Sequence, residues 1–134
     1  MSTDRTAIIR YRLEMANATL ADMKLLLEQG GSAWSIVNRA YYAMFYASLA
    51  LLASIDKGAS KHAGVIALFD KHFVKTGLLS RDLSRWLHNA FSLRQMADYR
   101  EMVRFDHQQV QDVTDHAEQF VREVEAFLKA GGLL

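Results

Sequence analysis

The chain of 134 residues contains no cysteine and no proline. The absence of cysteine excludes disulfide bonds, thiolate nucleophiles and zinc sites of the cysteine type, and favours a reducing, cytoplasmic location. The absence of proline removes the commonest helix breaker, which favours an almost entirely helical chain over a fold rich in turns. At this length we expect a single domain over residues 1–134.

Long hydrophobic runs are missing as well. The most apolar stretch, residues 40–53, is interrupted by Ser48 and is shorter than the roughly 18–20 residues that span a bilayer. The first residues carry charge but lead into no continuous apolar segment, so they do not resemble an export signal. We therefore expect no membrane span, and interpret residues 40–53 as the centre of a buried helix.

Apolar residues recur at helical spacing along nearly the whole chain. The first helix should bury Ile9, Leu13, Ala16, Leu20, Met23 and Leu27. The residues expected to cap the starts of helices are Ser32, Ser60, Ser80 and Asp106, the last with Gln109 as a capping box. The glycines expected to end helices are Gly30 with Gly31, Gly77, and Gly131 with Gly132. We expect an irregular segment at 99–105, where the apolar register breaks. The sequence thus predicts an all-α fold, an antiparallel up-and-down four-helix bundle with a shorter additional helix.

Two polar residues interrupt these apolar faces. Arg94 is in register with Leu83, Leu87 and Ala90, which places a guanidinium on a face that should point inward. Asn38 is likewise in register with apolar residues of the second helix. A buried cation needs a partner or a polar cleft. In a structural interpretation, Arg94 forms an ion pair with Asp98, and Asn38 forms a hydrogen bond with a backbone group or a tyrosine hydroxyl. In a functional interpretation, Arg94 and Asn38 line a binding site.

The net charge of +1 conceals a strong asymmetry along the chain. Residues 61–105 hold eight basic and four acidic side chains, whereas residues 106–134 hold two basic and six acidic ones. The basic middle segment could contact phosphate groups. Alternatively, the acidic last helix neutralises its basic neighbours, within one molecule or across a dimer.

Signatures of catalysis and of metal binding are weak. No two of the five histidines have the three- or four-residue spacing that would place them together on one helix face as ligands. Asp112 and His116 are four residues apart, but this pattern fits a surface contact better than a metal site. There is neither a glycine-rich phosphate loop nor a nucleophile elbow. We expect no metal and no cofactor.

Three motifs resemble the HEPN family, whose name stands for higher eukaryotes and prokaryotes nucleotide-binding. They are Asn38-Arg39-Ala40-Tyr41-Tyr42-Ala43-Met44-Phe45-Tyr46-Ala47, Lys61-His62-Ala63-Gly64-Val65 and Leu93-Arg94-Gln95-Met96-Ala97-Asp98-Tyr99. The resemblance implies a helical bundle that forms a homodimer, often encoded beside a minimal nucleotidyltransferase in a toxin–antitoxin-like pair. Many family members are metal-independent endoribonucleases that carry an R-x4-6-H motif.

This sequence departs from that motif. Arg94 occupies the position of the motif arginine, but Tyr99 stands where the histidine could be, as in the branch of the family that carries R-x-x-A-D-Y. Tyrosine, with a reference pKa near 10, is a much poorer acid–base group at neutral pH than histidine. Arg100 and His107 form a second formal match, in surroundings that do not resemble the family motif.

Three hypotheses follow. In the first, the protein binds RNA, a nucleotide or a nucleotidyltransferase partner through a polar cleft that contains Arg94, Asp98 and Tyr99. Asn38 and Arg39 line the same region, and Arg100 is a further binding residue. In the second, it is a metal-independent endoribonuclease toxin in which Arg94 acts with Tyr99 or His107 at the dimer interface. In the third, it is a structural interaction module in which Arg94 and Asp98 form a buried pair.

Overall fold

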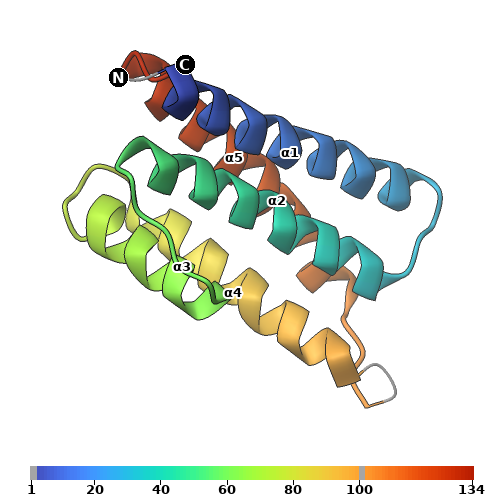
Figure 1. The fold of residues 1–134 in the computed structure, drawn as a ribbon. Helices are drawn as coiled ribbons and strands as arrows, with labels where there is room; N and C mark the ends of the chain where they lie inside the picture. Colours follow the sequence, from blue (N-terminus) through green and yellow to red (C-terminus); the bar gives the residue numbers. More distant parts are fainter. Residues whose placement is uncertain (1–2, 100–101) are drawn as a thin grey trace.

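The computed structural model describes residues 3–99 and 102–134, which form five α-helices (Figure 1). Their bounds are α1 Thr3–Glu28, α2 Ala33–Ser54, α3 His62–Phe69, α4 Arg81–Met96 and α5 His107–Ala130, with a π-helical turn η1 at Asp70–Val74 and a 3-10 turn η2 at Ala97–Tyr99. The described residues contain no strand. The predicted all-α fold, a helical bundle with one short helix, is confirmed.

Helix α2 lies at the centre of the bundle, with α1 and α5 on one side and α3 and α4 on the other (Figure 1). More than half of its residues are buried, and they include Tyr41, Met44 and Leu51, which have no exposed surface. A helix that is apolar nearly all round is stable only when neighbours cover it. No helix in residues 3–99 and 102–134 combines the length and the apolar character needed to cross a bilayer.

Three of the predicted helix starts are confirmed by their hydrogen bonds. Ser32 Oγ accepts from the Ser35 N–H at 3.2 Å, and Ser80 Oγ accepts from the Asp82 N–H at 3.1 Å. At the start of α5, Asp106 Oδ1 accepts from the Gln109 N–H at 2.7 Å, while the Gln109 side chain accepts from the Asp106 N–H at 3.0 Å. These reciprocal bonds form the predicted capping box.

The start of the third helix was predicted wrongly. Lys61 is the N-cap, it makes no side-chain capping bond, and the helix begins at His62 instead of immediately after Ser60. Lys61 has an extended backbone, and its carbonyl accepts the hydrogen bond of the first helical turn, from the Val65 N–H at 3.1 Å. The His62 ring that follows it stacks on Phe45 of α2. The helix also changes to π-helical hydrogen bonding at Asp70 before the chain turns at Gly77, which has a φ of +78°.

The apolar face of α1 is confirmed except at its last position. Ile9, Leu13, Ala16, Leu20 and Met23 are buried, but Leu27 is 39% exposed. Leu26 packs against the core instead. The turn that follows packs against Leu26, because a Cβ on Gly31 would be 2.8 Å from Leu26 Cδ2. The irregular segment predicted at 99–105 is observed at 102–105, and residues 100 and 101 lie outside the described residues.

Candidate functional site

The inward-facing arginine predicted on the fourth helix faces the aromatic residues of α2. Leu83, Leu87 and Ala90 are fully buried, and Arg94 continues their face of α4 as a half-buried side chain. Its Nη2 atom is 3.4 Å from the Tyr42 hydroxyl oxygen, to which it donates. The guanidinium carbon lies 5.8 Å from the centre of the Tyr41 ring and 5.7 Å from that of Tyr42. Arg94 is thus held by a weak hydrogen bond and two cation–π contacts.

No carboxylate lies within ion-pair distance of Arg94 in the part of the chain that the structure describes. The alternative in which Arg94 pairs with Asp98 is therefore not observed. Asp98 lies one turn beyond Arg94, in η2, and is exposed. A half-buried guanidinium keeps several N–H donors, and here they have no anionic acceptor. This arrangement leaves Arg94 able to bind an anion.

A histidine that sequence reasoning did not assign to the site completes this cluster. His62, the first residue of α3, has its Nδ1 atom 2.8 Å from the Tyr41 hydroxyl oxygen. Its ring stacks on Phe45 at a centroid distance of 4.2 Å and meets the edge of Tyr42 at 5.7 Å. These four residues, Tyr41, Tyr42, His62 and Arg94, form one cluster of side chains, for which we use the name Arg94 crevice.

Burial and charge shift two pKa values in the Arg94 crevice. Burial raises the pKa of Tyr41 well above its ordinary value, against the opposing effect of the nearby Arg94 charge. Burial also lowers the pKa of His62, and the positive charge of Arg94 lowers it further. Since the ordinary value for histidine is about 6.5, His62 is neutral at pH 7. Arg94 is then the cation of the crevice, beside two uncharged groups.

The predicted site residues Asn38 and Arg39 lie next to the crevice. Asn38 Oδ1 accepts from Arg39 Nε at 3.1 Å and from Arg39 Nη2 at 2.7 Å. This pair of bonds holds the Arg39 guanidinium carbon 5.4 Å from the centre of the Tyr42 ring. Asn38 therefore bonds a side chain, where the structural interpretation expected a backbone group or a tyrosine hydroxyl. Two arginines, from α2 and α4, meet at Tyr42.

The other predicted residues are not brought to this place within the described part of the chain. Tyr99 is 66% exposed, and it lines a shallow apolar groove with Met96, Met102 and Val103. No contact joins it to Arg94 among the described residues. His107 is exposed at the first turn of α5. Arg100 lies outside the described residues.

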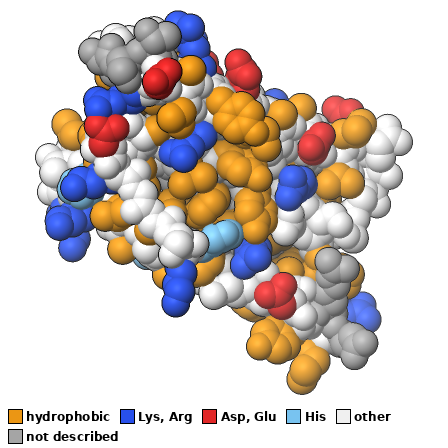
Figure 2. All heavy atoms as spheres, viewed as in Figure 1, with side chains coloured by type: hydrophobic (Ala, Val, Ile, Leu, Met, Phe, Trp, Pro, Cys, Tyr) orange, Lys and Arg blue, Asp and Glu red, His pale blue; other side chains and the backbone are white. Residues whose placement is uncertain are grey.

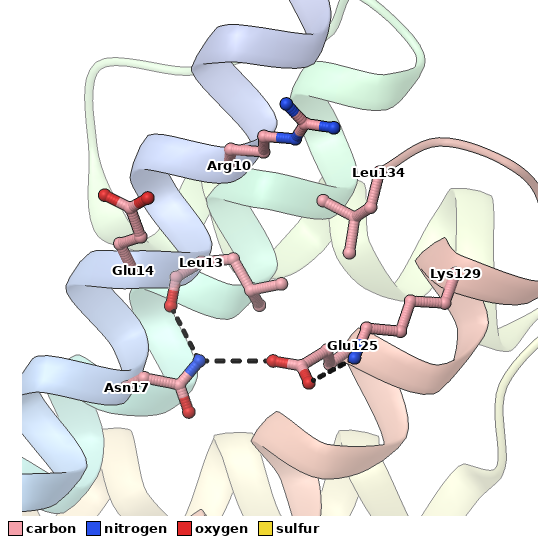
Figure 3. Close-up of a pocket in the computed structure, with 7 residues that line it drawn as sticks. All are labelled: Arg10, Leu13, Glu14, Asn17, Glu125, Lys129 and Leu134. Atoms are coloured by element: carbon pink, nitrogen blue, oxygen red, sulfur yellow. Dashed lines mark hydrogen bonds and ion pairs between the residues drawn. The ribbon is translucent and has the colours of Figure 1, made fainter.

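The polar groove between α1 and α5 is a separate feature (Figure 3). Asn17 Nδ2 donates to the Leu13 carbonyl at 3.1 Å and to Glu125 Oε1 at 3.2 Å, and Lys129 Nζ lies 3.1 Å from Glu125 Oε2. Glu125 is thus satisfied by its neighbours, and we interpret this groove as structural. Within residues 3–99 and 102–134, no three His, Asp or Glu side chains are placed to hold a metal ion.

Part of α2 is left uncovered beside the crevice. Tyr42, Tyr46 and Leu49 are only half-buried, although their neighbours along the helix are fully buried. Figure 2 shows hydrophobic side chains gathered over the middle of this face, with basic side chains and a histidine at their margins. Tyr42 belongs to the Arg94 crevice, and we call the other two, Tyr46 and Leu49, the α2 strip.

Comparison with known proteins identifies the fold family. The family model described as HEPN domain matches residues 9–127, which is most of the chain. The chain belongs to the HEPN domain family. It is 38% identical to a UPF0332 protein of Thermotoga maritima over 126 residues, which cover 94% of this chain and 95% of that protein. It is 32% identical to a Methanocaldococcus jannaschii protein named Putative toxin MJ0605, over 90% of this chain and 89% of that one.

A second Methanocaldococcus jannaschii protein, named Putative toxin MJ0142, is 31% identical over 73% of this chain and 67% of its own length. The HEPN match includes every residue of the Arg94 crevice. This HEPN domain has Tyr99 at the position where the R-x4-6-H motif could place its histidine. The histidine in the crevice is instead His62 of α3, and its hydrogen bond with Tyr41 joins residues 21 positions apart in the chain. No local motif could have revealed that contact.

Proposed function

We propose that this HEPN domain is the toxin-type member of a two-component module and binds RNA or a nucleotide at the Arg94 crevice. The observation that carries the proposal is the half-buried guanidinium of Arg94, which has no carboxylate partner among the described residues. A cation held only by aromatic rings and a neutral hydroxyl can still bind a phosphate in charge-assisted fashion. Arg39, whose guanidinium carbon lies 5.4 Å from the centre of the Tyr42 ring, brings a second cation to the same place.

The distribution of ion pairs supports an anionic ligand. The acidic helix α5 pairs through Glu118 with Lys24 of α1, and through Glu118 and Glu125 with Arg122 and Lys129 of its own helix. Among the described residues, no ion pair joins α5 to α3, η1 or α4. Within the described residues, the acidic last helix therefore makes no direct ion pair with the basic middle segment. Phosphate groups of an RNA strand can use that segment as a secondary contact.

The partners follow from the family and from the relatives. HEPN domains commonly form homodimers, and we infer that a second copy of this chain covers the α2 strip beside the crevice. The relatives named as toxins suggest a cognate antitoxin, for which a minimal nucleotidyltransferase is our candidate. Co-purification of this chain with the product of an adjacent nucleotidyltransferase gene tests that assignment, and the absence of any complex would contradict it.

Binding of RNA or a nucleotide is tested with two probes, a labelled single-stranded oligoribonucleotide and ATP. We expect wild type to bind at least one of them, and Arg94→Gln to lose that binding. Arg10→Gln is the matched control, because it removes the same charge from the α1–α5 groove. No binding by wild type, or equal binding by wild type and Arg94→Gln, would contradict the proposal.

The endoribonuclease hypothesis is tested in the same samples. Neither Tyr99 nor His107 contacts Arg94 within the described part of one molecule, so that mechanism requires the second protomer to supply them. The oligoribonucleotide is incubated with wild type and Arg94→Gln in the presence of a metal chelator. Cleavage by wild type alone would establish catalysis at Arg94, and an intact oligoribonucleotide would leave binding as the function of the crevice.

A further inference from the structure

The hydrogen bond between Tyr41 and His62 fixes the chemistry of the histidine ring. Tyr41 has no exposed surface, and its hydroxyl oxygen lies 2.8 Å from His62 Nδ1. A buried hydroxyl must place its proton on an acceptor. Among the described residues, His62 Nδ1 is the one acceptor that the structure gives this hydroxyl.

Tyr41 is therefore the donor in this bond. Burial raises the pKa of its phenol, so the hydroxyl keeps its proton at neutral pH. Nδ1 of His62 uses its lone pair to accept that proton and carries no hydrogen of its own. In a neutral imidazole the single N–H must then be at Nε2. The contact thus selects one of the two histidine tautomers.

The surroundings of His62 also keep the ring uncharged. On the side of α2 it faces Tyr41, Tyr42 and the apolar face of Phe45, at a centroid distance of 4.2 Å from the last. On the side of α4 it faces Phe91, at 6.4 Å, and the positive charge of Arg94. None of these groups stabilises an imidazolium by opposite charge, and among the described residues no carboxylate pairs with His62.

We propose that His62 binds a phosphate oxygen as a neutral N–H donor, through Nε2, beside the guanidinium of Arg94. The inference rests on the proposed function and adds a binding residue to it. Tyr41 is a positioning residue, because its hydroxyl fixes the tautomer that presents Nε2–H. The ligand class is a phosphate group of RNA or of a nucleotide, bound by one charged and one neutral donor. In this tautomer His62 is not a base at Nε2.

The tautomer is measured directly by nitrogen-15 NMR of the full chain labelled at histidine. We expect the His62 signals to show an unprotonated Nδ1 and a protonated Nε2 at neutral pH. His62→Gln assigns the signals, and the exposed His107 serves as the internal reference for a ring in water. A ring protonated at Nδ1, or at both nitrogens, would overturn the inference whatever the protein binds.

The donor role is measured by titration of the labelled oligoribonucleotide and of ATP. His62→Phe keeps an aromatic ring on Phe45 but has no N–H, and we expect it to weaken binding about ten-fold or more. His62→Gln can place an amide N–H near the same point and should restore part of that loss. The control is His116→Gln on α5, whose ring stacks on Trp86 and belongs to none of the proposed sites, and it should bind as wild type does. Circular dichroism checks that each variant is folded.

The outcomes separate this inference from the proposed function. If wild type binds and His62→Phe binds equally well, the donor role of His62 is wrong and the Arg94 crevice stands. If wild type binds neither probe, the donor role and the proposed function fail together. If Tyr41→Phe leaves the His62 tautomer unchanged, Tyr41 does not position the ring, and that part of the inference is overturned.

Discussion

Arg94 Nη2 donates to the hydroxyl of Tyr42 across 3.4 Å, between residues separated by 52 positions of the chain. The half-buried guanidinium of Arg94 therefore has a neutral hydroxyl as its hydrogen-bond acceptor, where a carboxylate would be usual. Such a group bears a cost of desolvation that no carboxylate in the described part of the chain offsets. A protein under selection for stability alone gains little from an arginine at this place, which supports a role for Arg94 in binding.

The first prediction concerns the stability of Arg94 variants. Arg94→Met keeps most of the apolar volume and removes the unpaired charge, so we expect the free energy of unfolding to change by no more than about 1 kcal/mol, or to rise. Urea denaturation measures this. The structural hypothesis of a buried ion pair predicts a loss of about 3–5 kcal/mol instead, and a loss of that size would contradict the unpaired state of Arg94.

The second prediction concerns pH. The pKa of His62 is lower in the folded than in the unfolded protein, so below the unfolded value of about 6.5 the unfolded state binds more protons at this residue. Above the unfolded pKa, His62 is neutral in both states and leaves the free energy of unfolding unchanged. As pH falls from there toward the lower pKa of the folded state, the unfolded protein takes up the proton more readily, and the free energy of unfolding decreases. Urea denaturation of wild type and His62→Gln over this range measures the effect. We expect the difference in unfolding free energy between the two proteins to shift in favour of His62→Gln as pH falls; a constant difference would contradict the lowered pKa.

The third prediction concerns the capping box of α5. Asp106→Ala removes the acceptor for the Gln109 N–H, which lies 2.7 Å from Oδ1, and should cost about 1 kcal/mol of unfolding free energy. Asp22→Ala, at an exposed position inside α1, is the control and should have a much smaller effect. Equal changes in the two variants would show that the cap contributes nothing beyond the loss of a surface charge.

The fourth prediction concerns the α2 strip. Tyr46→Glu places a charge on the surface that we assign to the second protomer, and sedimentation equilibrium should then show a monomer where wild type is a dimer. Leu25→Glu is the matched control, because Leu25 is 56% exposed on α1, away from the strip. A monomeric wild type, or a Tyr46→Glu variant that still dimerises, would contradict this assignment.

The features that the sequence predicted well depend on residues close together in the chain. Asp106 and Gln109 are three positions apart, and the capping box follows from that spacing. Arg94 points inward because it shares a helical period with Leu83, Leu87 and Ala90, which are buried. Local rules of helix capping and periodicity are sufficient for such features.

The features that were missed depend on tertiary contacts. Helix α3 begins at His62, whose ring packs on Phe45 of α2, and not immediately after the predicted cap Ser60. Arg94 has a candidate partner four positions away in Asp98, yet its observed partner is Tyr42 of another helix. His62 had no visible role because its link to Tyr41 is a long-range contact. Spacing predicts which way a side chain points, but not what it meets there.

The central claim, that Arg94 binds phosphate, is tested most directly by NMR of the arginine side chains during titration with a single-stranded oligoribonucleotide. The Nε–H signal of Arg94 is assigned by its loss in Arg94→Gln. We predict that this signal moves as the oligoribonucleotide is added, while the signal of Arg10 in the α1–α5 groove stays in place. An unmoved Arg94 signal in a protein that binds the oligoribonucleotide would contradict the account.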